Sequence, residues 1–394
     1  MSKIRVRKRG STYYFSFEAG RKPDGKRRTI EHGGYDDEQA AYDAGVKAYT
    51  DWKHGEIGIT TERVSVAEYL ESYVNVREPE LRRSSVAMYR STFRQINRYV
   101  GGIVLQDLRP RDVDSMLRRM LADGLARKSL STIKAIFKTA LDYAVYPAEL
   151  ISSNPVAAIK VPRGGKEHVI KRTVIGDRLL RHLLTDSFPE GHYMHIWCLI
   201  AYHTGMRVSE ICGLTWSDVD FNTGLLRISR QIVATKGFVG FGPPKTPSSE
   251  REIYLDRKIL AELKKWQREQ MKQRMAAGYK YMLVFKNDDD SFSLESQSTT
   301  RQNPVNLIIT QPNGKHCTSY HIISSLRPEG INSHSFRHTH TTLLAEDTSV
   351  SPKALAARLG HKNVDTTQNV YTHVTDKMRE DTVNSFQKIV DKIS

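Results

Sequence analysis

Four residues near the end of the sequence have side chains suited to phosphate chemistry: His334, Arg337, His361 and Tyr371. His334 and Arg337 are three positions apart, so a helix would present both on the same side. His361 follows an apolar-periodic helix expected at 354–359, and Tyr371 comes ten residues later. A guanidinium fork grips anions, imidazoles exchange protons, and a phenol is a nucleophile. Together they predict a site that binds a phosphate and attacks it with tyrosine.

Each of these residues also has an ordinary structural interpretation. A single tyrosine such as Tyr371 is more often a core or surface phenol, and a single histidine more often serves packing. The prediction therefore depends on whether upstream elements supply further cationic groups and a surface for the substrate.

The charge balance indicates what that substrate is. The chain of 394 residues carries a formal net charge of +16, which favours a polyanionic partner, nucleic acid first and an anionic membrane surface second. No apolar run approaches the length of a membrane span, and the first residues lack the apolar core of a signal peptide. We therefore expect a cytoplasmic protein with no membrane partner.

The cysteines and histidines predict neither disulfides nor a metal centre. The three cysteines have no CxxC pairing, and no His/Cys cluster has the spacing of a zinc site. We expect reduced thiols, no metal and no cofactor.

Residues 1–60 are expected to form a small basic sheet with one helix against it. Residues 12–18 alternate as a strand, 23–25 form a turn, 26–30 return as a second strand, and 37–52 are helical. Basic groups on the open face of such a sheet could enter a major groove, although a solvated charged hairpin would look similar. The candidate DNA contacts in this region are Arg5, Arg7, Lys8, Arg9, Lys26, Arg27 and Arg28.

Residues 64–160 are predicted to be a helical bundle. Helical periodicity covers 66–76, 84–100, 110–122 and 129–146, with glycines between the segments. Two lysines of the last helix lie one turn apart and are candidate phosphate contacts, although most such pairs simply lie on a solvated face. They are Lys134 and Lys138.

A Pro/Gly/Lys-rich linker at 160–167 predicts a hinge before a second large domain. Beyond it, an apolar helix at 192–203 precedes Arg207 and Glu210, which would share a helix face so that the carboxylate orients the guanidinium. Strands are expected at 225–232 and 252–255. The segment between them predicts a hairpin tip that carries Lys245.

These segments together resemble the tyrosine recombinases of the phage and mobile-element integrase type. TGMRVSEICGLTWSDVD resembles the family's first-arginine box and PKTPSSEREIYL its lysine hairpin. HSFRHTHTTLL resembles the His-x-x-Arg box, and LGHKNVDTTQNVYTHV the box with the last histidine and the nucleophile. The match spans roughly residues 171–374. One departure is Ser335-Phe336, where many members have Asp-Leu.

The resemblance implies a multidomain fold, mainly α with small β-sheets. An arm-binding sheet plus helix at 1–60 would precede a helical, SAM-like core-binding bundle at 64–160. A mixed α+β catalytic domain would follow at 168–380. The last segment, 381–394, has one apolar face and would form a tail helix that docks either on its own chain or on a neighbouring protomer.

The resemblance also implies the role of each site residue. Arg207 and Arg337 would neutralise the scissile phosphate, and Tyr371 would attack it to give a 3′-phosphotyrosine. His334 would act as the base, Lys245 as the general acid, and His361 as a hydrogen-bond donor. The partners would be double-stranded attachment-site DNA, three further copies of the chain in a tetramer, and an excisionase or host DNA-bending protein.

Three functions compete at this point. The first is an integrase that moves a phage or conjugative element through a Holliday junction, without metal or ATP. The second is a relaxing topoisomerase with related chemistry, which would have no need for the N-terminal basic sheet. The third is a DNA-binding regulator without catalysis, which the complete set of six candidate residues disfavours.

Overall fold

The computed structural model describes residues 4–21, 27–53, 63–164, 174–244, 247–347 and 350–360. The chain divides into two compact units, Met1–Val169 and Ile170–Ser394. Within the described ranges, no helix has the length and apolar character that crossing a bilayer requires.

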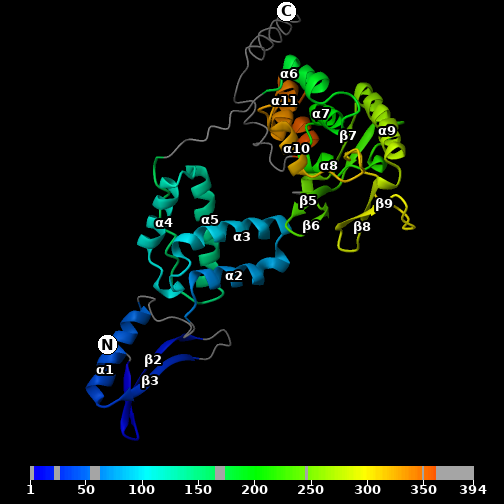
Figure 1. The fold of residues 1–394 in the computed structure, drawn as a ribbon. Coiled ribbons are helices and arrows are strands. Elements are labelled where there is room, and N and C mark those ends of the chain that lie inside the picture. The colour runs from blue at the N-terminus through cyan, green and yellow to red at the C-terminus, as the bar shows by residue number, and fades with distance from the viewer. Residues whose placement is uncertain are drawn as a thin grey trace, which may run out of the picture. The chain divides into compact units, whose positions relative to one another are not determined.

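The first unit begins with a three-stranded antiparallel sheet (Figure 1). Its strands are β1 (Arg5–Arg9), β2 (Thr12–Arg21) and β3 (Arg27–Tyr35), and α1 (Glu38–Lys53) follows. The buried rings of Phe15 and Phe17 pack toward α1, where Tyr49 meets Phe17 edge-on. β2 and α1 match the prediction, whereas β1 was not predicted. The returning strand was predicted at 26–30, but β3 continues to Tyr35. Gly33 pairs with Tyr14 of β2, whose ring occupies the space that a side chain at Gly33 would need.

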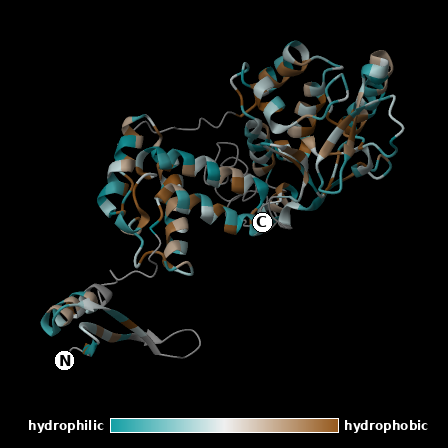
Figure 2. Cartoon of the chain, turned by 60° about the horizontal axis from the view of Figure 1, so that its bottom comes forward, coloured by the Kyte–Doolittle hydropathy of each residue, from teal (hydrophilic) through white to brown (hydrophobic). Residues whose placement is uncertain are grey.

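The remainder of the first unit is a bundle of amphipathic helices. A Ser65–Glu68 capping box starts the first helix, and Tyr69 donates a hydrogen bond to the Ala140 carbonyl on the last one. In Figure 2 these helices carry hydrophobic and hydrophilic residues on different sides, as a one-sided core requires. The helices are α2 (Val66–Arg77), α3 (Arg83–Val100), α4 (Pro110–Ala122) and α5 (Arg127–Val145).

The second unit combines helices with three two-stranded antiparallel sheets. Its helices are α6 (Asp177–His182), α7 (Tyr193–Thr204), α8 (Val208–Cys212), α9 (Arg257–Ala277), α10 (Ser319–Leu326), α11 (Ser333–Ala345) and α12 (Pro352–Leu359). Single-turn segments lie at Glu78–Glu80, Leu105–Asp107, Leu183–Ser187, Trp216–Asp218, Pro247–Ser249 and Gly278–Lys280 of the two units. Helix α7 is central, and its buried Trp197 meets Phe336 of α11 edge-on at 5.4 Å between ring centroids.

The sheets of the second unit correct the expected strand pattern. The predicted strand at 225–232 is two strands, β4 (Leu225–Ile228) and β5 (Gln231–Thr235). β4 pairs with β7 (Arg251–Tyr254), and β5 pairs with β6 (Phe238–Gly242), which was not predicted. β8 (Met282–Lys286) and β9 (Phe292–Ser296) form the third pair. The segment expected to be a hairpin tip instead connects β6 to β7. The expected fold class, mainly helical with small sheets, is confirmed.

Candidate active site

Arg207 is placed by the turn that ends α7. Gly205 takes a left-handed conformation with φ 62°, and a side chain there would collide with His340, since a Cβ would lie 2.7 Å from that ring. Arg207 follows as the residue that caps α8 rather than as a residue within a helix. Its backbone N–H donates to Glu210 at 3.0 Å, and its Nη1 donates to the same carboxylate at 2.7 Å. Glu210 therefore orients the guanidinium, as predicted, while also capping the helix.

Arg337 lies on α11 with its side chain buried. Its Nη1 donates to the Gly205 carbonyl at 2.8 Å, and its Nη2 donates to the Leu359 carbonyl at 2.7 Å. Burial, together with the nearby charge of Arg207, lowers the pKa of Arg337 to about 9, while Glu210 opposes that shift. The guanidinium therefore stays protonated at neutral pH.

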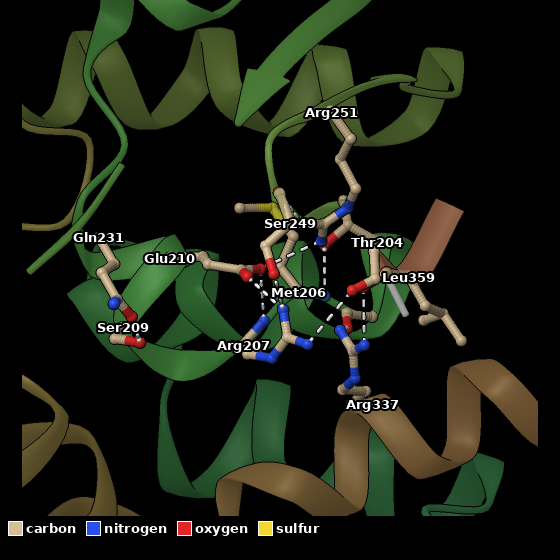
Figure 3. A network of polar contacts seen from close by, with 12 residues as sticks. Thr204, Met206, Arg207, Ser209, Glu210, Gln231, Ser249, Arg251, Arg337 and Leu359 are labelled. Carbon is tan, nitrogen blue, oxygen red and sulfur yellow. Dashed lines mark hydrogen bonds and ion pairs between the residues drawn. The ribbon is translucent and has the colours of Figure 1, made fainter. Parts of the chain in front are cut away.

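Three arginines meet at the C-terminal end of α12 (Figure 3). Arg251 donates to the Arg358 carbonyl at 2.7 Å, and Arg207 donates to the Gly360 carbonyl over a longer 3.4 Å. With the bond from Arg337 to Leu359, three consecutive carbonyls each accept from a different arginine. The last carbonyls of a helix have no partner within it and carry partial negative charge, so they attract cations.

Glu210 is the carboxylate at the centre of this cluster, and its side chain is only 1% exposed. It accepts hydrogen bonds from Arg207 and, at 3.1 Å, from Arg251. Burial alone would raise the pKa of Glu210, but the two arginines hold that pKa below its usual value. The guanidinium groups of Arg207, Arg251 and Arg337 are thus close to a single carboxylate, so the cluster retains excess positive charge. Buried excess charge of this kind is suited to binding an anion.

A second layer fixes α12 against α7. Arg358 donates from Nε to His340 Nε2 at 3.1 Å and from Nη2 to the His203 carbonyl at 3.0 Å. The other ring nitrogen of His340 lies 2.9 Å from the Tyr202 carbonyl and so carries the proton. Burial, followed by the charge of Arg358, lowers the pKa of His340 to about 4. His340 is therefore a neutral acceptor at physiological pH.

Half of the predicted catalytic set lies among the described residues. Arg207 and Arg337 converge on the end of α12, and His334 lies exposed in the first turn of α11, three residues before Arg337. The other three predicted site residues, Lys245, His361 and Tyr371, lie outside the described residues. The roles of all six stay predictions.

The predicted DNA contacts fall into four groups. Arg5, Arg7 and Arg9 pair with Ser16, Tyr14 and Thr12, which places them on the sheet face opposite Phe15 and α1. Lys8 instead shares the α1 side with Tyr13, and its ammonium lies 5.2 Å from that ring. On α5, Lys138 forms a 2.7 Å ion pair with Asp142, and Lys134 is partly buried. Lys26 and the side chains of Arg27 and Arg28 lie outside the described part.

Sequence reasoning missed three residues of the site: Arg251, His340 and Arg358. Arg251 lies in the same motif as the predicted residue Lys245, and His340 lies three residues after Arg337. Their residue types alone give no signal, because arginine and histidine are mostly exposed and only tertiary packing buries these particular ones.

Comparison with known proteins identifies the family of the chain. The family model of the phage integrase family matches residues 177–378. A XerC-like tyrosine recombinase of Caldanaerobacter subterraneus is 24% identical over 401 residues, covering 97% of both chains. The integrase of a Staphylococcus phage is 33% identical over 196 residues, covering 48% of this chain and 49% of its own.

Two solved structures share the fold. One is the Tn1549 transposon integrase in complex with transposon right end DNA, with TM-score 0.62, 19% identity, and coverage of 82% of this chain and 99% of that one. The other is a lambda integrase tetramer bound to a Holliday junction, with TM-score 0.51, 18% identity, and coverage of 92% and 96%. Since the family model spans more than half of the chain and includes the arginine cluster, the chain belongs to the phage integrase family and is a tyrosine recombinase.

Proposed function

We propose that this chain is a site-specific integrase that inserts and excises a phage or conjugative element. The observation that carries the proposal is the convergence of Arg207 and Arg337 on the end of α12, at Gly360 and Leu359, the two residues before His361. Relatives of the chain include a phage integrase, and a transposon integrase shares its fold, which supports a mobile-element substrate.

The two arginines would bind the scissile phosphate. Attack on a phosphodiester builds negative charge on the non-bridging oxygens, and planar guanidinium forks match those oxygens better than lysine does. The contact of Arg207 with Gly360 is long, at 3.4 Å, so this guanidinium could turn to a phosphate oxygen at small cost. Loss of either fork is expected to slow cleavage roughly 100- to 1000-fold.

Tyr371 would be the nucleophile. Its oxygen would form a bond to phosphorus while the bond to the 5′-oxygen breaks, leaving a 3′-phosphotyrosine and a 5′-hydroxyl. A phenol with a pKa near 10 is ionised in about one molecule in a thousand at pH 7, a deficit of roughly 4 kcal/mol. His334 as base and the nearby guanidinium charges would offset this deficit. Lys245 would protonate the leaving oxygen, and His361 would hydrogen-bond the phosphate.

The reverse reaction would rejoin the DNA. Attack by the 5′-hydroxyl of another strand replaces the phosphotyrosine bond with a phosphodiester, so each step exchanges one such bond for another. The free energy of the cut bond is retained, and the proposed reaction therefore needs no ATP. We also propose that the arginines supply the charge that a metal ion would otherwise provide.

The proposed assembly is a tetramer on two attachment-site duplexes that passes through a Holliday junction. The lambda integrase tetramer on such a junction supports this by shared fold. In this proposal, residues 1–60 bind arm DNA, 64–160 and 168–380 bind the core site, and 381–394 dock on a neighbour. An excisionase or a host DNA-bending protein would set the direction of recombination.

Trapping on a nicked suicide substrate tests the chemistry. The substrate carries an attachment site with a nick beside the cleavage position, so that the short 5′-hydroxyl fragment diffuses away and the adduct accumulates. Wild type and the matched control Tyr320→Phe, which removes an exposed phenol of the same unit, should both form a covalent adduct. Tyr371→Phe should form none.

Strand exchange between two duplexes then separates the integrase from a relaxing topoisomerase. Stable DNA binding without any adduct from the wild-type chain would refute the enzymatic proposal and leave a DNA-binding regulator.

A further inference from the structure

Arg251 occupies a central position in the site, although the proposed chemistry gives it no role. It is the first residue of β7, and its side chain is 6% exposed, compared with 21% for Arg207. It donates from Nη2 to Glu210 at 3.1 Å, from Nη1 to the Ser249 carbonyl at 2.8 Å, and from Nε to the Arg358 carbonyl at 2.7 Å. One side chain therefore joins α8, the segment before β7, and α12.

The residue that caps the end of α12, Gly360, lies close to this guanidinium. Gly360 has φ 67°, and a Cβ at this position would lie 3.1 Å from Arg251 Nη1 and 3.0 Å from the Ser248 carbonyl oxygen. Glycine is thus favoured both by its backbone conformation and by the close approach of Arg251. Gly360 is also the residue before His361 in the sequence.

The three arginines at this helix end differ in what they can do during the reaction. In the proposed function, Arg207 and Arg337 turn toward the phosphate, and each then has less capacity to hold a carbonyl of α12. Arg251 uses all three of its guanidinium nitrogens in bonds to the protein. Those bonds would persist while the other two arginines bind phosphate.

We propose that Arg251 is a positioning residue that holds the end of α12, and hence the start of the segment bearing His361 and Tyr371, against the phosphate-binding arginines. The inference rests on the proposed function. Arg251 touches no reacting atom in this scheme, and it acts on the cleavage rate through the placement of the nucleophile. An error of about 1 Å in such placement is enough to slow a reaction roughly 100-fold.

A competing route of action runs through the general acid. Arg251 also holds the Ser249 carbonyl, four residues beyond Lys245, and could act by ordering that loop. A substrate with sulfur in place of the bridging 5′-oxygen distinguishes the two routes. A thiolate leaves without protonation, because a thiol has a pKa near 8.5. This substrate rescues a defect in the general acid but leaves a misplaced nucleophile unrescued.

The experiment compares Arg251→Lys and Arg251→Met with wild type in the full chain. Arg227→Lys is the matched control, since it changes an exposed arginine on the partner strand β4. Single-turnover adduct formation is measured on the nicked substrate with oxygen or sulfur at the bridging position, and DNA affinity is measured by fluorescence anisotropy. We expect both Arg251 variants to form the adduct roughly 100-fold more slowly with either substrate, with unchanged DNA affinity.

Hydrogen exchange of residues 352–360 supplies a readout independent of catalysis. Lysine keeps the positive charge beside Glu210 but lacks the fork, so Arg251→Lys should remain folded and exchange faster at the end of α12. If Arg251→Met does not fold, the lysine variant alone decides. Wild-type cleavage rates in Arg251→Lys, rescue by sulfur, or unchanged exchange in α12 would each overturn the inference. Absence of an adduct from the wild-type chain would instead overturn the proposed function itself.

Discussion

Acidification should destabilise the second unit in part through His340, the histidine whose pKa is lowered to about 4. This side chain is 7% exposed and extends from α11 to contact α7 and α12. Its Nε2 accepts a hydrogen bond from Arg358 at 3.1 Å. Protonation of Nε2 would remove this acceptor and place a second positive charge beside the guanidinium. The charges of Arg337 and His203 also oppose protonation of His340. The folded state therefore resists protonation of His340.

The size of the effect follows from the two pKa values. Burial and Arg358 lower the pKa of His340 to about 4 in the fold, and an unfolded chain has about 6.5. The unfolded state therefore binds more protons between these values, and stability falls as the pH falls through this window. The full stability is present above about pH 6.5. About 2 kcal/mol is lost by pH 5, and about 3 kcal/mol is lost below pH 4.

Denaturant unfolding at several pH values measures this loss. Three of the four tryptophans, Trp197, Trp216 and Trp266, lie in the second unit, so tryptophan fluorescence reports mainly on it. His340→Gln is the reference, because its amide oxygen can still accept from Arg358 but does not titrate. Other titrating groups cancel in the difference between the two chains.

Wild type should lose about 2 kcal/mol more than His340→Gln between about pH 7.5 and 5. Parallel pH profiles for the two chains would show that His340 is not held neutral by Arg358, and the reasoning would fail.

Three further predictions follow from the same geometry. Glu210→Gln leaves two guanidinium groups without their buried carboxylate and should lower the free energy of unfolding by about 3 kcal/mol, measured by denaturant titration. Gly360→Ala should cost about 1–2 kcal/mol in the same assay, because its φ of 67° strains any other residue, and a Gly102→Ala control has open space. Arg7→Ala should reduce by about 1 the slope of the logarithm of DNA affinity against the logarithm of salt concentration. Lys8→Ala, on the α1 side of the sheet, should leave this slope unchanged.

Local pattern was enough to predict the bundle helices. The predicted segment 110–122 coincides with α4, because Pro110 is favoured in the first turn and buried positions recur with helical spacing. β1 escaped prediction because Val6 is its only apolar residue, so the sequence RVRKR resembles a basic tail more than a strand. The predicted 225–232 strand breaks in two because β4 and β5 pair with different partners, which no local pattern encodes.

The site was only partly predictable for a related physical reason. Arg207 and Arg337 belong to recognisable motifs, and their meeting point at the end of α12 follows from the fold. Arg251 and Arg358 became visible only in three dimensions. An arginine is buried or exposed according to the carbonyls and carboxylates that other segments bring to it, often from more than a hundred residues away.

The end of α12 explains how the arginines can be held together before any phosphate arrives. Guanidinium groups gathered in a buried place repel one another and lose hydration, so such a cluster is unstable without compensation. Here Glu210 compensates part of the charge, and the carbonyls of residues 358–360 supply the negative end of a helix dipole. The donors are thus already oriented toward acceptor oxygens, and a phosphate oxygen could replace a carbonyl with little reorganisation. Preorganisation of this kind lowers a barrier because its cost is met during folding. In the proposed function, it would also tie the two phosphate-binding arginines to the helix that precedes the segment with the proposed nucleophile.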